Sequence, residues 1–264
     1  MRADHTFSGR LPLAAMRLAR SAALLALHVL FPRTCPHCRE DLPFREEGPL
    51  CRGCEDSLEP IPELCCGKCG LPLDSGGELC PGCRRSGGPA ISGPVRSAFA
   101  FGPAVRSLVH AFKYRGRAAL AEPLGLRMAR AYDLRPELKP YNFVVPVPLF
   151  GDREKERGFN QSALLAGILA REKGLFLLEG AAERTRGGLP QAGLSRKERR
   201  ANVKGMFRVP DPALVRGRRI LIVDDVATTL STVEELAAAL SAAGADATAV
   251  FTLAREPVKE KEGE

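Results

Sequence analysis

The cysteines of this chain are grouped in a way that suits metal binding. Eight of the nine form four Cys-x2-Cys pairs within one short segment. The pairs are Cys35 with Cys38, Cys51 with Cys54, Cys66 with Cys69, and Cys80 with Cys83. Two such pairs supply the four thiolates of a tetrahedral zinc site. The sequence therefore predicts a zinc module with ligands for two ions, and it leaves open whether the pairs combine sequentially or in an interleaved cross-brace.

A disulfide framework is the main alternative for these cysteines. Nothing in the sequence marks the chain for export, and thiols stay reduced in the cytoplasm, so the zinc module is favoured. Redox catalysis is a weaker alternative, because four pairs suit a scaffold better than a single reactive site. A cysteine module of this size has too small a core to fold without a staple, so we expect the zinc to be structural.

A second group of chemically capable residues lies near the end of the chain. The apolar run Ile220–Val223 leads into two adjacent carboxylates, and a turn rich in hydroxyl groups follows. Adjacent carboxylates can accept hydrogen bonds from ribose hydroxyls, while backbone N–H groups at a helix N-terminus attract a phosphate. The alternative is a strand and a helix cap without a ligand. We predict a sugar-phosphate site made of Asp224, Asp225, Val226, Ala227, Thr228, Thr229, Leu230, Ser231 and Thr232.

The spacing of apolar residues predicts the elements that position these side chains. Strands are predicted at residues 98–101, 142–147, 220–223 and 247–253, and helices at residues 105–114, 120–132, 160–173 and 231–243. Strands that alternate with helices imply a parallel sheet with crossover connections. In such a sheet, a turn at the carboxyl end of a strand faces the ligand crevice. The predicted fold class is therefore α/β, with a parallel sheet and a small N-terminal zinc-ribbon domain.

Composition divides the chain into four expected parts. They are an amphipathic N-terminal helix (1–32), a double zinc-ribbon module (33–86), the α/β domain (97–256) and a disordered tail (257–264). No segment reaches the length of about 18 uninterrupted apolar residues that a membrane-spanning helix needs. We therefore expect a cytoplasmic protein whose N-terminal helix packs on the protein or, alternatively, lies on the inner membrane as a peripheral association.

The charge of the chain points to anionic partners. The formal net charge is +8 and the pI is about 9.2, which favours phosphorylated small molecules, nucleic acid or an anionic membrane face. The absence of tryptophan argues against a broad platform for base stacking. A basic segment between residues 183 and 204 reads either as a solvated surface or as a mobile flap that binds anions. Its nucleic-acid candidates are Arg196, Lys197, Arg199, Arg200 and Lys204.

Residues 220–232 resemble the phosphoribosyl pyrophosphate signature of type I phosphoribosyltransferases, in which a strand ends in two acids and a threonine-rich turn. The motifs Val145–Pro148 and Arg157–Gln161, together with the Cys-x2-Cys pairs, narrow the resemblance to the ComF family. These are phosphoribosyltransferase-like proteins linked to DNA uptake in natural transformation. Further matching residues stand in the family's order: Thr185, Gln191, Leu194, Arg199 and Asn202.

The resemblance implies a type I phosphoribosyltransferase-like domain that binds phosphoribosyl pyrophosphate together with Mg²⁺. It implies that Asp224 and Asp225 act as the catalytic carboxylates and that Arg153 and Arg157 lie on the pyrophosphate side. A transferase of this kind moves the phosphoribosyl group to a nitrogen nucleophile. The alternative is a non-catalytic uptake factor that keeps the fold, binds single-stranded DNA and passes it to a DNA-uptake helicase.

The chain departs from the family pattern at Leu230, where the family has glycine. Glycine in this place permits a positive φ and a close approach of the backbone to a phosphate. Another residue in a left-handed conformation costs about 1–2 kcal/mol. Lys113 and Tyr114 also match a family pattern, which suggests that they line the crevice.

Overall fold

The computed structural model describes residues 22, 25–26, 29–30, 32–43, 48–74, 76–114, 117–186 and 204–256. The expected tail and most of the expected N-terminal helix lie outside these residues. The chain divides into two compact units, residues 1–55 and residues 56–264, and each is described by itself. In the first unit the described residues include all but the last residue of α2 (Arg52–Asp56) and a small bridge between Thr34 and Asp41.

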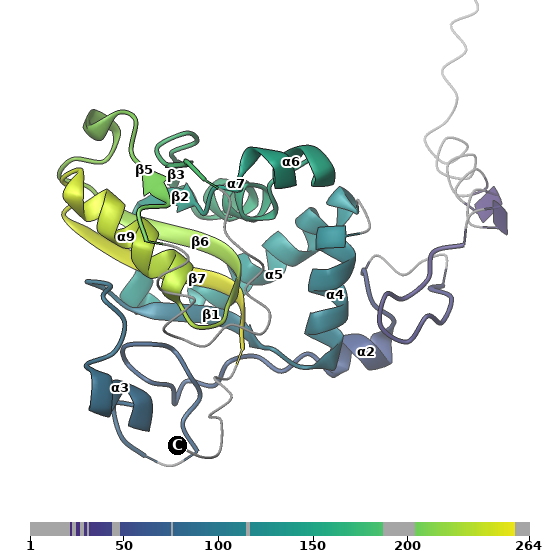
Figure 1. Cartoon of the computed structure of the whole chain (residues 1–264). Coiled ribbons are helices and arrows are strands. Elements are labelled where there is room, and N and C mark those ends of the chain that lie inside the picture. The colour runs from purple at the N-terminus through teal and green to yellow at the C-terminus, as the bar shows by residue number, and fades with distance from the viewer. Residues whose placement is uncertain are drawn as a thin grey trace, which may run out of the picture. The chain divides into compact units, whose positions relative to one another are not determined.

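A parallel sheet of five strands forms the centre of the second unit, in the order β1-β7-β6-β2-β3 (Figure 1). The strands are β1 (Val95–Ala100), β2 (Phe143–Pro146), β3 (Phe176–Leu177), β6 (Arg219–Ala227) and β7 (Ala247–Arg255). Every neighbouring pair in this sheet is parallel. Parallel strands need crossover connections, and helices provide them here. The predicted α/β fold class with a parallel sheet is confirmed.

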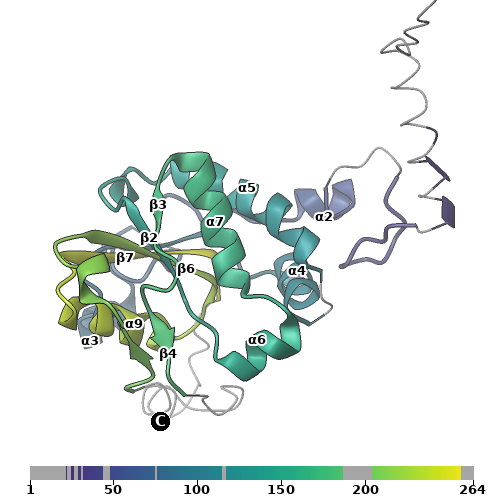
Figure 2. The same ribbon diagram turned by 90° about the horizontal axis from the view of Figure 1, so that it is seen from above.

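Helices cover both faces of the sheet. The helices α5 (Ala121–Asp133) and α7 (Gln161–Lys173) pack on one face, with α5 against β1 and β7 and with α7 against β6 and β2. The helix α9 (Ser231–Ala242) packs on the other face (Figure 2). The helix α4 (Pro103–Tyr114) lies between β1 and α5 in the chain. This arrangement buries β6 and β7 on both sides and explains their nearly continuous apolar sequences.

The central strand β6 is longer than its apolar run suggested. The sequence predicted that the strand ends at Val223 and that a turn follows, but β6 continues through both carboxylates to Ala227. The reason is pairing with β7, which extends as far as Ala227 opposite Arg255. The two acids are therefore held by strand geometry rather than by a turn.

Several short elements had no clear signal in the sequence. The helix α6 (Gly151–Arg157) follows β2. The antiparallel strands are β4 (Glu183–Arg184), which begins the basic segment, and β5 (Phe207–Arg208), which follows it. The helix α3 (Pro81–Ser86) starts beside the last cysteine pair. In the described part of the chain, 3-10 turns are found at Ala118–Leu120, Pro136–Leu138 and Pro212–Leu214.

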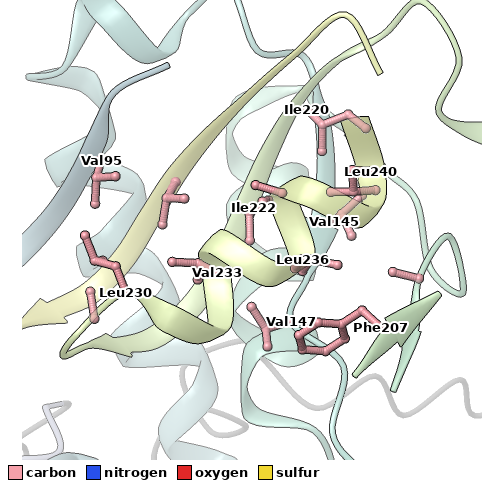
Figure 3. Packing of buried hydrophobic residues seen from close by; sticks show 14 of the residues in the cluster. Val95, Val145, Val147, Phe207, Ile220, Ile222, Leu230, Val233, Leu236 and Leu240 are labelled. Atoms are coloured by element: carbon pink, nitrogen blue, oxygen red, sulfur yellow. The ribbon is translucent and has the colours of Figure 1, made fainter. Parts of the chain in front are cut away.

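The core on the α9 face contains cysteines as well as aliphatic side chains. Val95, Ile222 and Leu236 are fully or almost fully buried there, and Figure 3 shows the side chains of β6 and α9 facing one another. The same cluster includes four buried cysteines of the second unit: Cys66, Cys69, Cys80 and Cys83. The second pair of cysteine motifs is thus part of the core that supports the sheet.

Among the described residues, no helix is long and apolar enough to cross a membrane.

Candidate functional site

A cavity of about 370 Å³ lies beside the carboxyl ends of β2 and β6. Its position agrees with the rule that ligands of open α/β sheets bind outside the carboxyl ends of the strands. All nine residues of the predicted sugar-phosphate site line it, from Asp224 to Thr232. Three cationic side chains line the same cavity: Lys113, Arg157 and Arg184. The structure therefore brings two carboxylates, a hydroxyl-rich turn and three cations together in one space.

Asp224 is held by hydrogen bonds from two elements. Its Oδ1 accepts from the Ser162 hydroxyl at 2.7 Å and from the backbone N–H of Asp225 at 2.8 Å. Burial and the neighbouring charge of Asp225 together raise the pKa of Asp224 to about 6. Its carboxyl group therefore changes charge within the physiological range of pH.

Asp225 is paired with a lysine from α4. The Lys113 Nζ lies 2.8 Å from the Asp225 Oδ2, and the carboxylate is 7 % exposed. Burial alone lowers the pKa of Lys113, but the charge of Asp225 and the hydrogen bond to it outweigh burial and raise this pKa. The lysine thus stays charged and offsets the repulsion between the two adjacent carboxylates. The sequence suggested only that Lys113 lines the crevice, and the structure gives it a defined partner.

The turn between β6 and α9 contains a residue with a positive φ that is not glycine. Leu230 has φ 69° and ψ −2° and stands at the N-cap of α9. Its carbonyl accepts from the N–H of Glu234 at 2.8 Å, which begins the helix. Its side chain is 6 % exposed and lies in the core near Val233 (Figure 3). The position does require the left-handed conformation that glycine would adopt easily, and burial of the leucine side chain offsets the cost.

The expected pyrophosphate side is shaped by the start of α7. Asn160 caps this helix, because its Oδ1 accepts from the N–H groups of Ser162 at 2.9 Å and Ala163 at 3.3 Å. Its Nδ2 donates to the carbonyl of Val147 at 3.1 Å, which fixes the loop after β2 against the helix. Asn160 therefore acts here as a cap that also orients the cavity wall.

Of the two arginines predicted for this side, Arg157 lies at the cavity. Arg157 lines the cavity, lies 5.0 Å over the ring of Tyr114 and donates to the Gln161 Oε1 at 3.1 Å. Arg153 belongs to α6, but its side chain lies outside the described part of the structure. Gln161 is buried, and its Nε2 has no hydrogen-bond partner among the described residues.

The basic segment is described only at its ends. Thr185 donates its backbone N–H to the Met206 carbonyl at 2.9 Å, which extends the contact between β4 and β5. Arg184, at one end of the segment, lines the cavity, and Lys204, at the other end, is exposed. The remaining nucleic-acid candidates lie outside the described residues: Arg196, Lys197, Arg199 and Arg200.

The cysteine pairs combine sequentially in two clusters of four. One cluster is Cys35, Cys38, Cys51 and Cys54, and the other is Cys66, Cys69, Cys80 and Cys83. Within each cluster all the sulfur atoms lie within 4.8 Å of one another. The Cys38 and Cys51 sulfurs are 3.5 Å apart, and those of Cys69 and Cys80 are 3.6 Å apart.

These distances fit zinc rather than disulfides. Four thiolates at the usual zinc–sulfur distance form a tetrahedron with edges of about 3.8 Å, whereas a disulfide requires about 2.05 Å. None of the nine cysteines, all of which the structure describes, forms a disulfide. Burial acts to raise the pKa of Cys66, but backbone N–H groups, those of Cys69 and Cys80 first, outweigh it and lower the pKa to about 6. The clusters are therefore suited to hold two structural zinc ions.

Two residues near the site were missed by sequence analysis. Ser162, which donates to Asp224, stands in the first turn of a predicted helix, and a hydroxyl in that place was a usable signal. Arg255, which donates to the carbonyls of Ala227 and Thr228, is the last residue of the apolar strand β7, and nothing in its local sequence indicates this role.

The comparison with protein families matches residues 26–85 to a double zinc ribbon domain. Among solved structures, the hypoxanthine-guanine phosphoribosyltransferase of L. donovani is similar with a TM-score of 0.32 and 19 % identity, over 52 % of this chain and 71 % of that chain.

Curated relatives match most of the chain. Competence protein F of Haemophilus influenzae is 32 % identical over 84 % of this chain and 96 % of its own length. DNA utilization protein YhgH of Escherichia coli K12 is 34 % identical over 85 % of this chain and 97 % of its own length. Competence protein ComFC of Streptococcus pneumoniae is 29 % identical over 78 % of this chain and 87 % of its own length. With its cysteine clusters and its carboxylate-and-turn cavity in the places that the family motifs predict, the chain belongs to the ComF family.

Proposed function

We propose that this chain binds phosphoribosyl pyrophosphate with Mg²⁺ in the cavity at the carboxyl end of β6 and works in DNA uptake. The observation that supports this most is the shared cavity of Asp224, Asp225 and the turn 228–232, with Lys113 and Arg157 beside them. Carboxylates suit the ribose hydroxyls, and the N-terminus of α9 with its hydroxyl groups suits the 5′-phosphate. The arginine suits the pyrophosphate, because its planar fork donates hydrogen bonds in pairs.

The residues of the cavity also fit a role for Mg²⁺. Carboxylate oxygens together with substrate phosphates are the ligands that Mg²⁺ prefers. When bound with the ligand, Mg²⁺ neutralises part of the pyrophosphate charge and makes pyrophosphate a better leaving group. Before the ligand binds, Lys113 pairs with Asp225 at 2.8 Å. When the ligand binds, the chain's own residues hold the ribose and orient the phosphate.

The proposed reaction is transfer of the phosphoribosyl group to a nitrogen nucleophile. The nucleophile attacks the anomeric carbon, the bond to pyrophosphate breaks, and the electron pair leaves with pyrophosphate. The protein contributes mainly by positioning groups and by stabilising charge, as in other displacement reactions at a charged leaving group. A binding role without turnover is the second reading of the same cavity, and detection of pyrophosphate distinguishes the two.

Calorimetric titration with phosphoribosyl pyrophosphate and Mg²⁺ tests the proposal. We expect binding by the native protein and at least tenfold weaker binding by Asp224→Asn/Asp225→Asn. A matched control is Asp246→Asn, which changes an exposed carboxylate at the amino end of β7, away from the carboxyl ends of the strands. Absence of binding by the native protein overturns the proposal.

The pH dependence of the same titration reports on Asp224. Since the pKa of this carboxyl is raised to about 6, it is mostly protonated at pH 5 and mostly ionised at pH 7.5. The protonated form is a poorer acceptor for ribose hydroxyls and a poorer ligand for Mg²⁺. We expect weaker binding at pH 5. Comparison with Asp224→Asn removes the contribution from titration of the ligand's own phosphates.

Single-stranded DNA is the second partner that we propose. Two observations favour it: relatives over most of the chain carry the names competence protein and DNA utilization protein, and the formal net charge is +8. Phosphate contacts by lysine and arginine give affinity that does not depend on sequence. Transfer of the DNA to an uptake helicase and a cytoplasmic location stay predictions from the sequence.

A further inference from the structure

The second cysteine cluster packs against the amino end of β1, in the same unit as the candidate site. Gly70, next to Cys69, has φ +68°, and a Cβ added there would overlap the carbonyl oxygen of Val95, the first residue of β1. Any larger residue would collide with the strand backbone. The turn Cys66–Gly70 therefore packs backbone to backbone on the sheet, and its cysteines belong to the α9-side core.

Arg255 connects this turn to the ligand turn. Its side chain is almost completely buried, with the residue 2 % exposed. Its Nε donates to the carbonyl of Cys69 at 3.1 Å. Its Nη1 donates to the carbonyls of Ala227 at 2.8 Å, Thr228 at 2.5 Å and Glu256 at 2.8 Å. One guanidinium thus bridges a cysteine of the cluster and the two residues that begin the phosphate turn.

The bridge is selective for arginine. A planar guanidinium has five N–H donors in a fixed fork, whereas lysine offers one nitrogen on a flexible stem. Burial of a cation is costly unless opposite charge lies nearby. A zinc ion with four thiolates carries a net charge of −2, because four negative sulfurs exceed the two positive charges of the metal. Four backbone carbonyls accept hydrogen bonds from the buried Arg255 guanidinium, and the second cysteine cluster would add negative charge beside it when it holds a metal ion.

Two other buried arginines serve as natural comparisons. Arg96 in β1 is 9 % exposed and donates to the carbonyls of Cys66 at 3.5 Å and Gly67 at 3.3 Å, on the cysteine side of the bridge. Arg135 is 7 % exposed and donates to the carbonyls of Ile61 at 2.7 Å and Pro62 at 3.3 Å, in a different part of the unit. Arg255 differs from both in that it also donates to residues of the ligand turn.

We propose that Arg255 is a positioning residue that couples metal binding in the second cysteine cluster to the conformation of the ligand turn Thr228–Thr232. Loss of the metal releases the turn Cys66–Gly70 and with it the Cys69 carbonyl, which loosens the hold of Arg255 on the carbonyls of Ala227 and Thr228. The zinc ribbon then controls ligand affinity although it supplies no ligand contact. The part that concerns affinity rests on the proposed function, whereas the part that concerns the turn does not.

The test uses hydrogen exchange of the backbone amides in the full-length, zinc-loaded protein without ligand. In Arg255→Met, which keeps an unbranched apolar side chain, we expect amides of residues 226–232 to exchange at least tenfold faster. Arg135→Met is the matched control for loss of a buried arginine, and exchange at 226–232 should stay within about twofold of the native rate. Arg96→Met is expected to speed amide exchange in the turn Cys66–Gly70 more than in residues 226–232.

Metal removal from one cluster at a time provides the second arm. Cys80→Ser/Cys83→Ser should raise exchange at 226–232 as Arg255→Met does, while Cys35→Ser/Cys38→Ser should leave it near the native rate. Combining Cys80→Ser/Cys83→Ser with Arg255→Met should add little to either change, because both act through one contact. If Arg255→Met does not fold, Arg255→Lys retains the charge with fewer donors and should show the same change to a smaller extent.

The outcomes separate this inference from the proposed ligand. Unchanged exchange at 226–232 in Arg255→Met, or equal changes in Arg255→Met and Arg135→Met, overturns the coupling. Native protein that fails to bind phosphoribosyl pyrophosphate overturns the proposed function but leaves the exchange result to stand. If the coupling and the proposed ligand both hold, Arg255→Met should weaken binding of phosphoribosyl pyrophosphate with Mg²⁺ by about 10–100-fold. This is the usual range for residues that orient a ligand-binding group without contacting the ligand.

Discussion

Leu230 stands in the left-handed backbone conformation, which costs energy for a residue with a Cβ and almost none for glycine. Its φ is 69°, and only Arg39 shares a positive φ among the described non-glycine residues. A left-handed non-glycine residue costs about 1–2 kcal/mol, and burial of a leucine side chain contributes about 1.5–3 kcal/mol. Because Leu230 is 6 % exposed, the two effects are of similar size and the departure from glycine is tolerated.

Substitution of Leu230 separates these two effects. Leu230→Ala and Leu230→Gly both remove the buried side chain, but only alanine keeps the Cβ that disfavours a positive φ. We expect both variants to be less stable than the native protein, and Leu230→Gly to be more stable than Leu230→Ala by about 1 kcal/mol. Urea unfolding at equilibrium measures the difference.

The control for this comparison is Leu236, which is fully buried in the middle of α9. There the usual helix preference applies, so Leu236→Gly should be less stable than Leu236→Ala by about 1 kcal/mol. The same order of stability at both positions would show that the left-handed conformation of Leu230 is not a cost to the fold.

At the scale of elements, α7 depends on Asn160 for its start and for its attachment to the loop after β2. Asn160→Ala removes both the cap and the bond to the Val147 carbonyl, whereas Asn160→Asp keeps a cap oxygen and loses only that bond. We expect Asn160→Asp to be more stable than Asn160→Ala by about 1 kcal/mol. Thermal or urea unfolding measures this, with Asn142, an exposed residue outside any helix, as the control.

The control substitutions Asn142→Asp and Asn142→Ala should differ by less than about 0.5 kcal/mol, as is usual for surface changes away from caps. Equal stability of the two Asn160 variants would mean that the cap contributes nothing to the free energy of unfolding. Since Ser162 follows the cap by two residues and donates to Asp224, the start of α7 also positions the site.

At the scale of the whole molecule, the excess of positive charge predicts salt-sensitive binding of single-stranded DNA. Reversal of charge in Arg199→Glu/Arg200→Glu should weaken binding and make the plot of log affinity against log salt shallower by about 1–2, since each phosphate contact on a single strand contributes about 0.7 to the slope. Fluorescence anisotropy of a labelled oligonucleotide at several salt concentrations measures both quantities.

A variant with the same change of net charge elsewhere is the control for the DNA experiment. Arg130→Glu/Arg216→Glu changes two exposed arginines outside the basic segment. A smaller effect there than at Arg199 and Arg200 assigns the contact to the basic segment. Equal effects would assign it to the overall charge, and an unchanged slope in Arg199→Glu/Arg200→Glu would remove the segment from consideration as a DNA contact.

The sequence by itself determined those features whose physical cause is local. A Cys-x2-Cys turn brings two thiolates together within four residues, so metal binding could be predicted without the fold. The helix over residues 161–173 could be predicted because its cap, Asn160, and its terminating Gly174 with φ 64° are adjacent to it. The acids and the hydroxyl-rich turn could likewise be recognised because they are consecutive.

The tertiary structure alone decided which distant groups meet. Parallel pairing brings the carboxyl ends of strands that are far apart in sequence to one edge of the sheet. The helices that follow or connect these strands therefore also place residues at this edge. Only this places Lys113 on Asp225, Ser162 on Asp224 and Arg255 between Cys69 and Thr228. It also decided that the cysteine pairs combine sequentially, because packing of the second cluster into the α9-side core joins neighbouring pairs. Such contacts depend on strand order and register, which no short stretch of residues specifies.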